Sequence, residues 1–190
     1  MAGRVGLTVP RLTEAAAELA DESGFAAVTA SALARRLGVS VASLYAHVKN
    51  LEELRGRVTA LALTELADRA AEAIGGRAGK DALVALANAY RSYALVHPGR
   101  YAAAGARIEP DSPAAAPAVR NADLTRAVLR GYGDLPAAEQ THAVRMIGSA
   151  LRGFADLESS GAFAHSGDTS ASWERMLDAL DVALSHWPRG

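Results

Sequence analysis

The chain has 190 residues and contains no cysteine, so it can form neither disulfide bonds nor thiolate metal sites. It lacks any run of about 18 apolar residues that could span a membrane, and its first residues lack the apolar stretch of a signal peptide. β-Branched residues are sparse, alanine is abundant, and no alternating apolar pattern typical of strands stands out. We therefore expect an all-α, soluble, cytoplasmic protein with no membrane partner.

A second absence is local. No Asp or Glu occurs from Ser23 to Leu51, although Arg35, Arg36 and Lys49 lie in this segment, and the whole chain has a formal net charge of −1. A DNA-binding surface needs a local positive field, because neutralising phosphates releases their counterions and so supplies much of the affinity. The segment therefore indicates a DNA-binding surface on a protein that is not basic overall.

The same segment has apolar residues at helical spacing, interrupted in the middle. Thr29 can cap a first helix with its hydroxyl, Gly38 can adopt the left-handed conformation that ends it, and Ser40 can cap a second helix. The pattern predicts a helix-turn-helix whose second helix, from Val41 to His47, would enter the major groove of DNA.

The flanking segments predict how this motif is supported. A helix capped by Thr8 would contribute Leu12 and Leu19 to a small three-helix core, which Phe25 completes. A long helix capped by Asn50 would then connect this reading head to a second body. We predict a helix-turn-helix DNA-binding domain at 1–50 and a C-terminal ligand-binding and dimerisation domain at 51–190, with about nine helices in total.

Two long apolar stripes mark the last two predicted helices, and small residues close to the first stripe would let helices approach each other. Two such stripes exceed what a thin single subunit needs to cover, so we predict a dimer interface built as a four-helix bundle, two helices from each subunit. The alternative is that both stripes are buried within one chain. The predicted interface residues are Val144, Ile147, Leu151, Trp173, Met176, Leu177, Leu180 and Leu184.

Aromatic and polar residues from three C-terminal segments are candidates for lining a ligand pocket, because a cavity with a few polar groups is the usual form of a binding site. Aromatic residues at helical spacing are more often ordinary core, so the two interpretations stand side by side. The candidate ligand-binding residues are Tyr90, Tyr93, His97, Tyr101, Met146 and Phe154.

The sequence gives little indication of a phosphate-binding loop, a metal site or a catalytic site. The Gly75–Lys80 stretch has the wrong spacing for a phosphate-binding loop, and Asp81 replaces the required Ser or Thr. The five histidines show no metal-ligand spacing, and no nucleophile motif or patterned carboxylate pair appears. We expect no enzyme activity, metal or cofactor. The alternatives are a helical enzyme and an adaptor whose head binds protein, although the acid-free segment argues against the adaptor.

The segment Leu33–Leu54 resembles the head of the TetR family of bacterial transcription regulators, including its Leu-Gly-Val-Ser and Leu-Tyr-Ala-His-Val runs and the Lys49 that follows. The resemblance covers residues 8–60. Further on, Leu151–Phe163 resembles the C-terminal domain type named for a Trp-His-Gly pattern, with Leu-Arg-Gly in its place. The resemblance implies a homodimer that binds a near-palindromic double-stranded DNA operator, most often as a repressor, and that a small-molecule effector releases.

The resemblance also implies roles for individual residues. Phosphate contacts would come from Thr29, Ser31, Ser40, Tyr45, His47 and Lys49, and base contacts from Val41, Ala42, Ser43 and Ala46. The alternatives are that Tyr45 packs against the core and that His47 merely ends the helix. Small, mostly apolar base-reading groups favour thymine methyl contacts over guanine recognition, which needs Arg or Lys. Specificity would then depend partly on DNA shape and bridging water.

Overall fold

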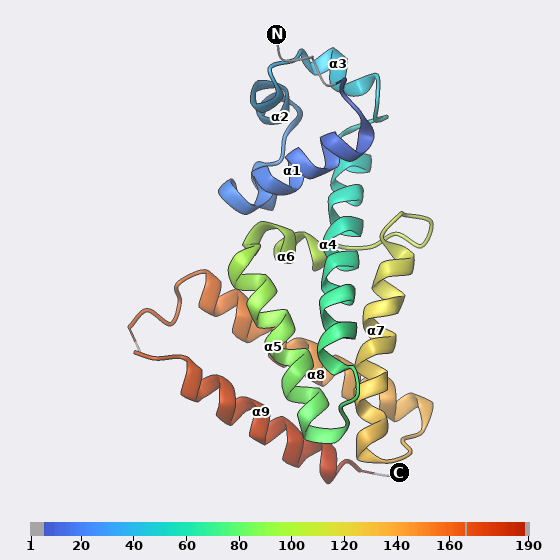
Figure 1. Ribbon diagram of the computed structural model, residues 1–190, viewed down its shortest axis with the longest axis vertical. Helices are drawn as coiled ribbons and strands as arrows, with labels where there is room; N and C mark the ends of the chain where they lie inside the picture. Colours follow the sequence, from blue (N-terminus) through green and yellow to red (C-terminus); the bar gives the residue numbers. More distant parts are fainter. Residues whose placement is uncertain (1–5, 166, 189–190) are drawn as a thin grey trace. The chain divides into compact units, whose positions relative to one another are not determined.

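The computed structural model describes residues 6–165 and 167–188, and within these ranges it contains nine α-helices, two short 3₁₀ segments and no strand (Figure 1). The prediction of an all-α protein with a helix-turn-helix head is confirmed. No helix of the described part combines the length and apolar character needed to cross a membrane. The elements are α1 (Val9–Ser23), η1 (Phe25–Ala27), α2 (Ala30–Leu37), α3 (Val41–Tyr45), α4 (Leu51–Ile74), α5 (Gly79–Val96), α6 (Pro98–Ala104), α7 (Ala115–Leu129), η2 (Arg130–Tyr132), α8 (Ala137–Ser159) and α9 (Ser170–Ser185).

The chain forms two compact units. The first comprises the chain as far as Thr64 together with His97–Pro117, and the second comprises Glu65–Val96 and the chain from Ala118 onward. Helix α4 therefore begins in the first unit and ends in the second. We call α1 to α3 together with η1 the head. The observed division differs from the predicted boundary at residue 50, because α6 packs on α1 and so belongs to the same unit as the head.

Local capping explains where the helices of the head begin and end. The Thr29 hydroxyl accepts a hydrogen bond from the Ala32 N–H at 3.2 Å and caps α2. Gly38 ends α2 in the left-handed conformation, with φ 66°. Ser40 caps α3 by accepting from the Ser43 N–H at 3.1 Å. Helix α3 ends at Tyr45, two residues earlier than predicted, so that His47 follows the helix.

An apolar core holds the three helices of the head together. Leu12, Leu33, Leu44 and Val48 are buried in it, as the sequence pattern predicted. The first part of α4 completes this core with further buried residues. Arg55 of α4 also donates to the carbonyl of Val28 through Nε at 3.1 Å and Nη2 at 2.8 Å. The segment that leads into α2 is therefore tied directly to α4.

Helices α1 and α6 approach each other unusually closely within the first unit. A Cβ atom added to Gly99 would lie 1.9 Å from the backbone oxygen of Ala20, so only glycine fits at this position. Beside it, Asp21 accepts from the Arg100 N–H at 2.8 Å and pairs with Arg100 Nε at 3.0 Å and His97 Nδ1 at 3.1 Å. Glu14 adds an ion pair with Arg100 at 2.7 Å. These contacts fix α6 on the head.

The second unit is a helical bundle whose core comes mainly from α5, α7, α8 and α9. The polar atoms of Tyr and Trp side chains that pack in this bundle form hydrogen bonds with acidic side chains. The Tyr132 hydroxyl donates to Asp181 at 2.8 Å, and Trp187 Nε1 donates to Glu139 at 2.8 Å. The pKa of Tyr132 is raised above its ordinary value, chiefly because burial disfavours the phenolate.

The eight residues of the predicted dimer interface lie in or against the core of the second unit. Six of its eight residues are buried in the core of the single chain, and the other two, Val144 and Met176, are partly buried against the same core. The stripes of α8 and α9 pack on α5 and on each other, so the alternative of burial within one chain is the one the structure shows. The six buried side chains therefore face the core of their own chain, and the part of all eight residues in a dimer interface stays a prediction. The six buried residues are Ile147, Leu151, Trp173, Leu177, Leu180 and Leu184.

Candidate DNA-binding surface and ligand pockets

The surface of α2 and α3 carries all of the predicted DNA contacts. Each of the ten side chains is exposed, whereas Leu44 and Val48 between them are buried and anchor the segment. The alternative of packing for Tyr45 is not supported, because 45% of its surface is exposed. The ten residues are Thr29, Ser31, Ser40, Val41, Ala42, Ser43, Tyr45, Ala46, His47 and Lys49.

Small side chains dominate the exposed face of α3. Val41, Ala42 and Ala46 have no polar side-chain atoms, and the Ser40 and Ser43 hydroxyls already bond to each other at 2.8 Å. Such a face lets the helix backbone approach base edges closely and offers methyl groups to thymine. It cannot make the bidentate contacts by which Arg or Lys recognises guanine.

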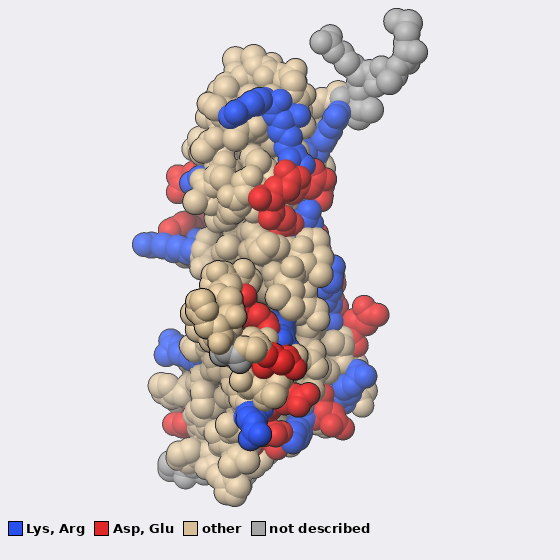
Figure 2. Space-filling model, turned by 90° about the vertical axis from the view of Figure 1, so that its left-hand side faces the viewer, with Lys and Arg blue, Asp and Glu red and all other residues tan. Residues whose placement is uncertain are grey.

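The positive charge of this surface is smaller than the sequence suggests. Arg36 pairs with Glu18 at 2.9 Å and Glu22 at 2.6 Å, both on α1. The hydrogen bond from Arg36 lowers the pKa of Glu22, and the hydrogen bond to Glu22 raises the pKa of Arg36. Figure 2 shows, on the displayed face, Lys and Arg side chains beside a group of Asp and Glu side chains. The acid-free run in sequence therefore does not exclude acids that are close in space.

Lys49 lies where the head joins α4, and its backbone position is fixed. Its N–H donates to Glu53 Oε2 at 2.7 Å, while the Glu53 N–H donates to Asn50 Oδ1 at 2.8 Å. This reciprocal pattern resembles a capping box and confirms Asn50 as the cap of α4. The hydrogen bond from the Lys49 backbone, together with one from Arg57, holds the pKa of Glu53 below its ordinary value. Among the described residues, Arg35 and Lys49 are thus the exposed cations of the segment that form no salt bridge.

The six candidate ligand residues take part in packing and hydrogen bonds of the two units, and their contact with a ligand stays a prediction. Tyr93 is fully buried, and its hydroxyl donates to Glu65 at 2.7 Å, while the Tyr90 hydroxyl donates to Asn121 at 3.0 Å. Met146 and Phe154 pack against the core of the second unit, and Phe154 contacts Trp173 with ring centroids 5.0 Å apart. His97 and Tyr101 belong to the first unit. The aromatic spacing therefore marked buried or partly buried side chains.

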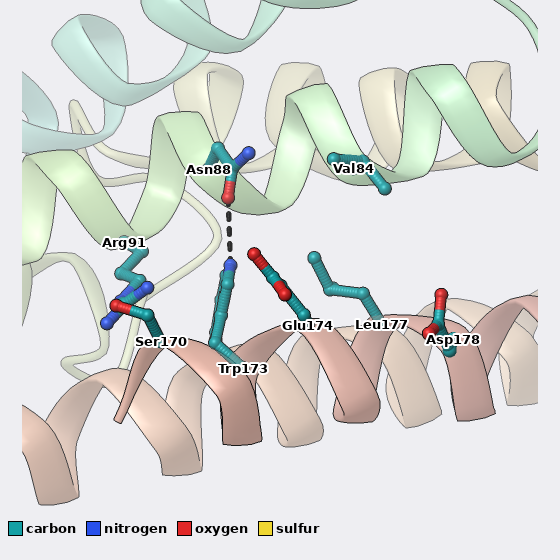
Figure 3. Close-up of a pocket in the computed structure, with 8 residues that line it drawn as sticks. All are labelled: Val84, Asn88, Arg91, Ser170, Trp173, Glu174, Leu177 and Asp178. Carbon is teal, nitrogen blue, oxygen red and sulfur yellow. Dashed lines mark hydrogen bonds between the residues drawn. The ribbon is translucent and has the colours of Figure 1, made fainter. Parts of the chain in front are cut away.

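A pocket of about 310 Å³ opens instead between α5 and α9. Figure 3 shows Val84, Asn88 and Arg91 of α5 facing residues of α9, with Trp173 Nε1 donating to Asn88 Oδ1 at 2.8 Å. Sequence reasoning missed this pocket, although polar side chains three residues apart on an otherwise apolar helix are a signal that could have indicated it. The remaining lining residues are Ser170, Glu174, Leu177 and Asp178.

A network of contacts fixes Arg91 in this pocket. Its guanidinium lies 5.2 Å from the centroid of the Trp173 ring, and it donates to Glu158 through Nε at 2.7 Å and to Thr169 at 3.2 Å. The hydrogen bond from Arg91 holds the pKa of Glu158 below its ordinary value of 4.5. The charge of Arg91 is thus compensated within the chain, whereas Glu174 leaves an exposed carboxylate at the pocket.

Among the residues that the structure describes, no group of three or more His, Asp or Glu side chains is arranged to hold a metal ion. The described surfaces offer instead an exposed helix-turn-helix and a polar pocket, which suit binding.

Comparisons with known proteins agree with this geometry. Residues 12–58 match the family described as bacterial regulatory proteins, tetR family, and residues 83–180 match the tetracyclin repressor-like C-terminal domain. The uncharacterized HTH-type transcriptional regulator YobS of Bacillus subtilis is 33% identical over 187 residues, which cover 97% of this chain and 92% of that protein. The uncharacterized HTH-type transcriptional regulator Rv0681 of Mycobacterium tuberculosis is 38% identical over 175 residues, 91% of this chain and 79% of that protein.

Solved structures share the fold. BioQ in complex with its double-stranded DNA operator superposes with a TM-score of 0.69 at 22% identity, covering 95% of this chain and 99% of that one. A TetR variant from Acinetobacter baumannii in complex with minocycline gives a TM-score of 0.73 at 23% identity, covering 97% and 99%. The Trp-His-Gly subtype stays a prediction. From the family matches and the two curated relatives, the chain belongs to the TetR family of bacterial regulatory proteins and is a DNA-binding regulator of transcription.

Proposed function

We propose that this protein is a cytoplasmic repressor that binds a near-palindromic operator as a homodimer and leaves it when a small-molecule effector binds. The observation that carries the proposal is the exposed surface of α2, α3 and the residues that flank them. Every predicted DNA contact is exposed on this surface, and none is buried in the core of the head. Helix α3 would lie in the major groove, with Val41, Ala42, Ser43 and Ala46 at the base edges. Tyr45 and Lys49 would contact the phosphates on either side.

A dimer needs a surface other than the buried stripes. The outward faces of α8 and α9 carry small or apolar exposed residues, among them Ser149, Gly153, Ala179 and Val182. A Cβ atom added to Gly153 would meet nothing within 4 Å, so a partner helix could approach the backbone there. We place the dimer interface on these faces, where an isologous contact would form a four-helix bundle.

The pocket between α5 and α9 is the effector site that the second unit best supports. Its carboxylates, Glu174 and Asp178, outnumber its uncompensated cations, because Arg91 is paired with Glu158. Asp178 pairs with Lys80 at 2.7 Å, so Glu174 is the lining carboxylate that remains for an effector. An effector with an aromatic body and a cationic or hydrogen-bond-donating group would contact Trp173 and Glu174 together.

Electrophoretic mobility shift with DNA from upstream of the protein's own gene tests the proposal. We expect a salt-sensitive, sequence-selective complex that contains two copies of the chain, since phosphate contacts give a strong salt dependence. Absence of selective binding to genomic fragments, together with a catalytic turnover or a protein partner captured through the head, would favour an enzyme or an adaptor instead.

Charge substitution tests the proposed interface. Val182 and Val119 are equally exposed, at 59% each, but only Val182 lies on α9. We expect Val182→Arg to give a monomer in light scattering, because a buried unpaired charge is strongly unfavourable at an interface. Val119→Arg is the matched control and should remain a dimer. A dimer in both variants would place the interface elsewhere.

A further inference from the structure

We propose that the first unit contains a second small-molecule site, beneath the helix-turn-helix, that takes a small neutral molecule with an apolar body and one hydroxyl or carbonyl group. The site is a pocket of about 230 Å³ between η1, the start of α4 and the connection from α6 to α7. It belongs entirely to the first unit, so it is separate from the pocket between α5 and α9. Its lining residues are Phe25, Glu52, Arg55, Gly56, Thr59, Ala106, Arg107, Glu109, Ser112 and Ala114.

The size and charge of this pocket limit what it can hold. Its volume is below the roughly 300 Å³ at which pockets for drug-sized ligands begin, so a compound with a single ring fits best. Two arginines and two glutamates line it, and Arg107 pairs with Glu109 at 2.9 Å. Because the formal charges of the lining cancel, an uncharged ligand is favoured over an ion.

Gly56 gives the pocket its depth. It lies inside α4, where glycine is less favourable than alanine because it costs more backbone entropy. A Cβ atom added there would meet nothing within 4 Å, so no close packing of helices requires the glycine. The backbone of Gly56 lines the pocket together with the apolar surfaces of Phe25 and Ala114, and the space that a side chain would fill stays open.

Ser112 supplies the polar group that a ligand would satisfy. Its Oγ atom is buried and has no hydrogen-bond partner in the described structure. Its backbone is satisfied, since the N–H donates to the Glu109 carbonyl at 3.0 Å and the carbonyl accepts from the Ala115 N–H at 3.1 Å. A buried hydroxyl without a partner is unfavourable, and a ligand hydroxyl or carbonyl in the pocket would complete its hydrogen bonding.

Arg55 connects this pocket to the DNA-binding surface. Its Nη2 donates to the carbonyls of Ala26 and Val28, and its guanidinium lies 5.9 Å from the centroid of the Phe25 ring. Val28 directly precedes Thr29, the cap of α2. A ligand that moves Phe25 or Arg55 therefore shifts the start of the helix-turn-helix, so that ligand and operator binding become coupled. This coupling rests on the proposed function, whereas the binding site itself does not.

Binding of benzyl alcohol to the full-length protein, followed by NMR chemical-shift perturbation, tests the site. Toluene serves as the matched probe without a hydroxyl, and benzoate as the charged one. We expect saturable binding of benzyl alcohol with shifts at Phe25, Thr59 and Ala114, and weaker binding of the other two probes. No saturable binding below the solubility limit, or tighter binding of benzoate, would overturn the proposal.

Two variants localise the binding. Gly56→Leu should abolish it by filling the pocket, and Ser112→Ala should weaken benzyl alcohol by about fivefold, the value of one hydrogen bond, without changing toluene. Val119→Leu, at an exposed position of α7 in the second unit, should bind as the wild type does. Circular dichroism confirms folding, and Gly56→Ala, with the smaller side chain, should show intermediate binding if Gly56→Leu does not fold. Unchanged binding in both Gly56 variants and in Ser112→Ala overturns the site.

Operator affinity, measured with and without benzyl alcohol, separates the two proposals. We expect weaker operator binding in the presence of the probe for the wild type and no change for Gly56→Leu. If the probe binds as expected while operator affinity stays constant, the coupling is wrong. If the protein binds no operator at all, the proposed function fails although the site stands.

Discussion

The close approach of α1 and α6 predicts a large effect from adding one methyl group. In Gly99→Ala the new Cβ would lie 1.9 Å from the Ala20 oxygen and 2.0 Å from its carbonyl carbon. Since ordinary contacts begin at 3.4 Å, the two helices would have to separate by about 1.5 Å. That movement would also lengthen the 2.8 Å hydrogen bond from the Arg100 N–H to Asp21.

The cost follows from these contacts. Overpacking of this kind costs about 1–3 kcal/mol, and the higher helix propensity of alanine returns only about 0.5–1 kcal/mol. We therefore expect the first unit to lose about 1–2 kcal/mol of stability in urea unfolding, followed by hydrogen exchange at α1 amides. Gly56→Ala in the same unit is the control, because its Cβ meets nothing within 4 Å and it should be neutral or stabilising. A Gly99→Ala variant as stable as the wild type would show that α1 and α6 are not in close contact.

Two further predictions concern charge. Lys49→Ala should flatten the log–log dependence of operator affinity on salt concentration by about two units for a dimer. Arg36→Ala should leave this slope unchanged, because Glu18 and Glu22 already neutralise the Arg36 side chain. Equal slopes for the two variants would contradict this assignment. Glu158→Gln should cost about 1.5–3 kcal/mol at neutral pH, the value of hydrogen bonds to a charged group. The pKa of Glu158 is lowered in the folded chain, so its stabilising contribution is complete above its ordinary pKa of 4.5. This contribution is lost as the pH falls through the lowered pKa of the folded state. The difference in thermal stability between variant and wild type should therefore disappear in acid.

The local features of the head could be predicted because they depend on neighbours in sequence. Capping by Thr29 and Ser40 and the left-handed Gly38 need only the residues within one helical turn. The state of Arg36 could not be predicted in this way. The carboxylates that neutralise it are on α1, 14 and 18 residues away in sequence, and only the folded head brings them together.

The second unit shows the same limit for apolar patterns. The stripe on α9 correctly marked a buried face, but periodicity does not reveal whether that face is covered by another chain or by α5 and α8 of the same one. Tyr93 likewise marked a buried side chain, and its hydroxyl donates to Glu65 inside the bundle. Pockets depend on where packing leaves space, as at Gly56, and a single sequence carries little information about that space.

The most direct test of the central claim, that the exposed face of α3 reads DNA, is the operator affinity of Ala42→Glu measured by fluorescence anisotropy. Ala42 is exposed, so the substitution leaves the core of the head unchanged while it places a carboxylate at the base edges and near the phosphates. We predict that the variant unfolds at the same temperature as the wild type and loses selective operator binding. A variant that binds the operator with wild-type affinity would contradict the account.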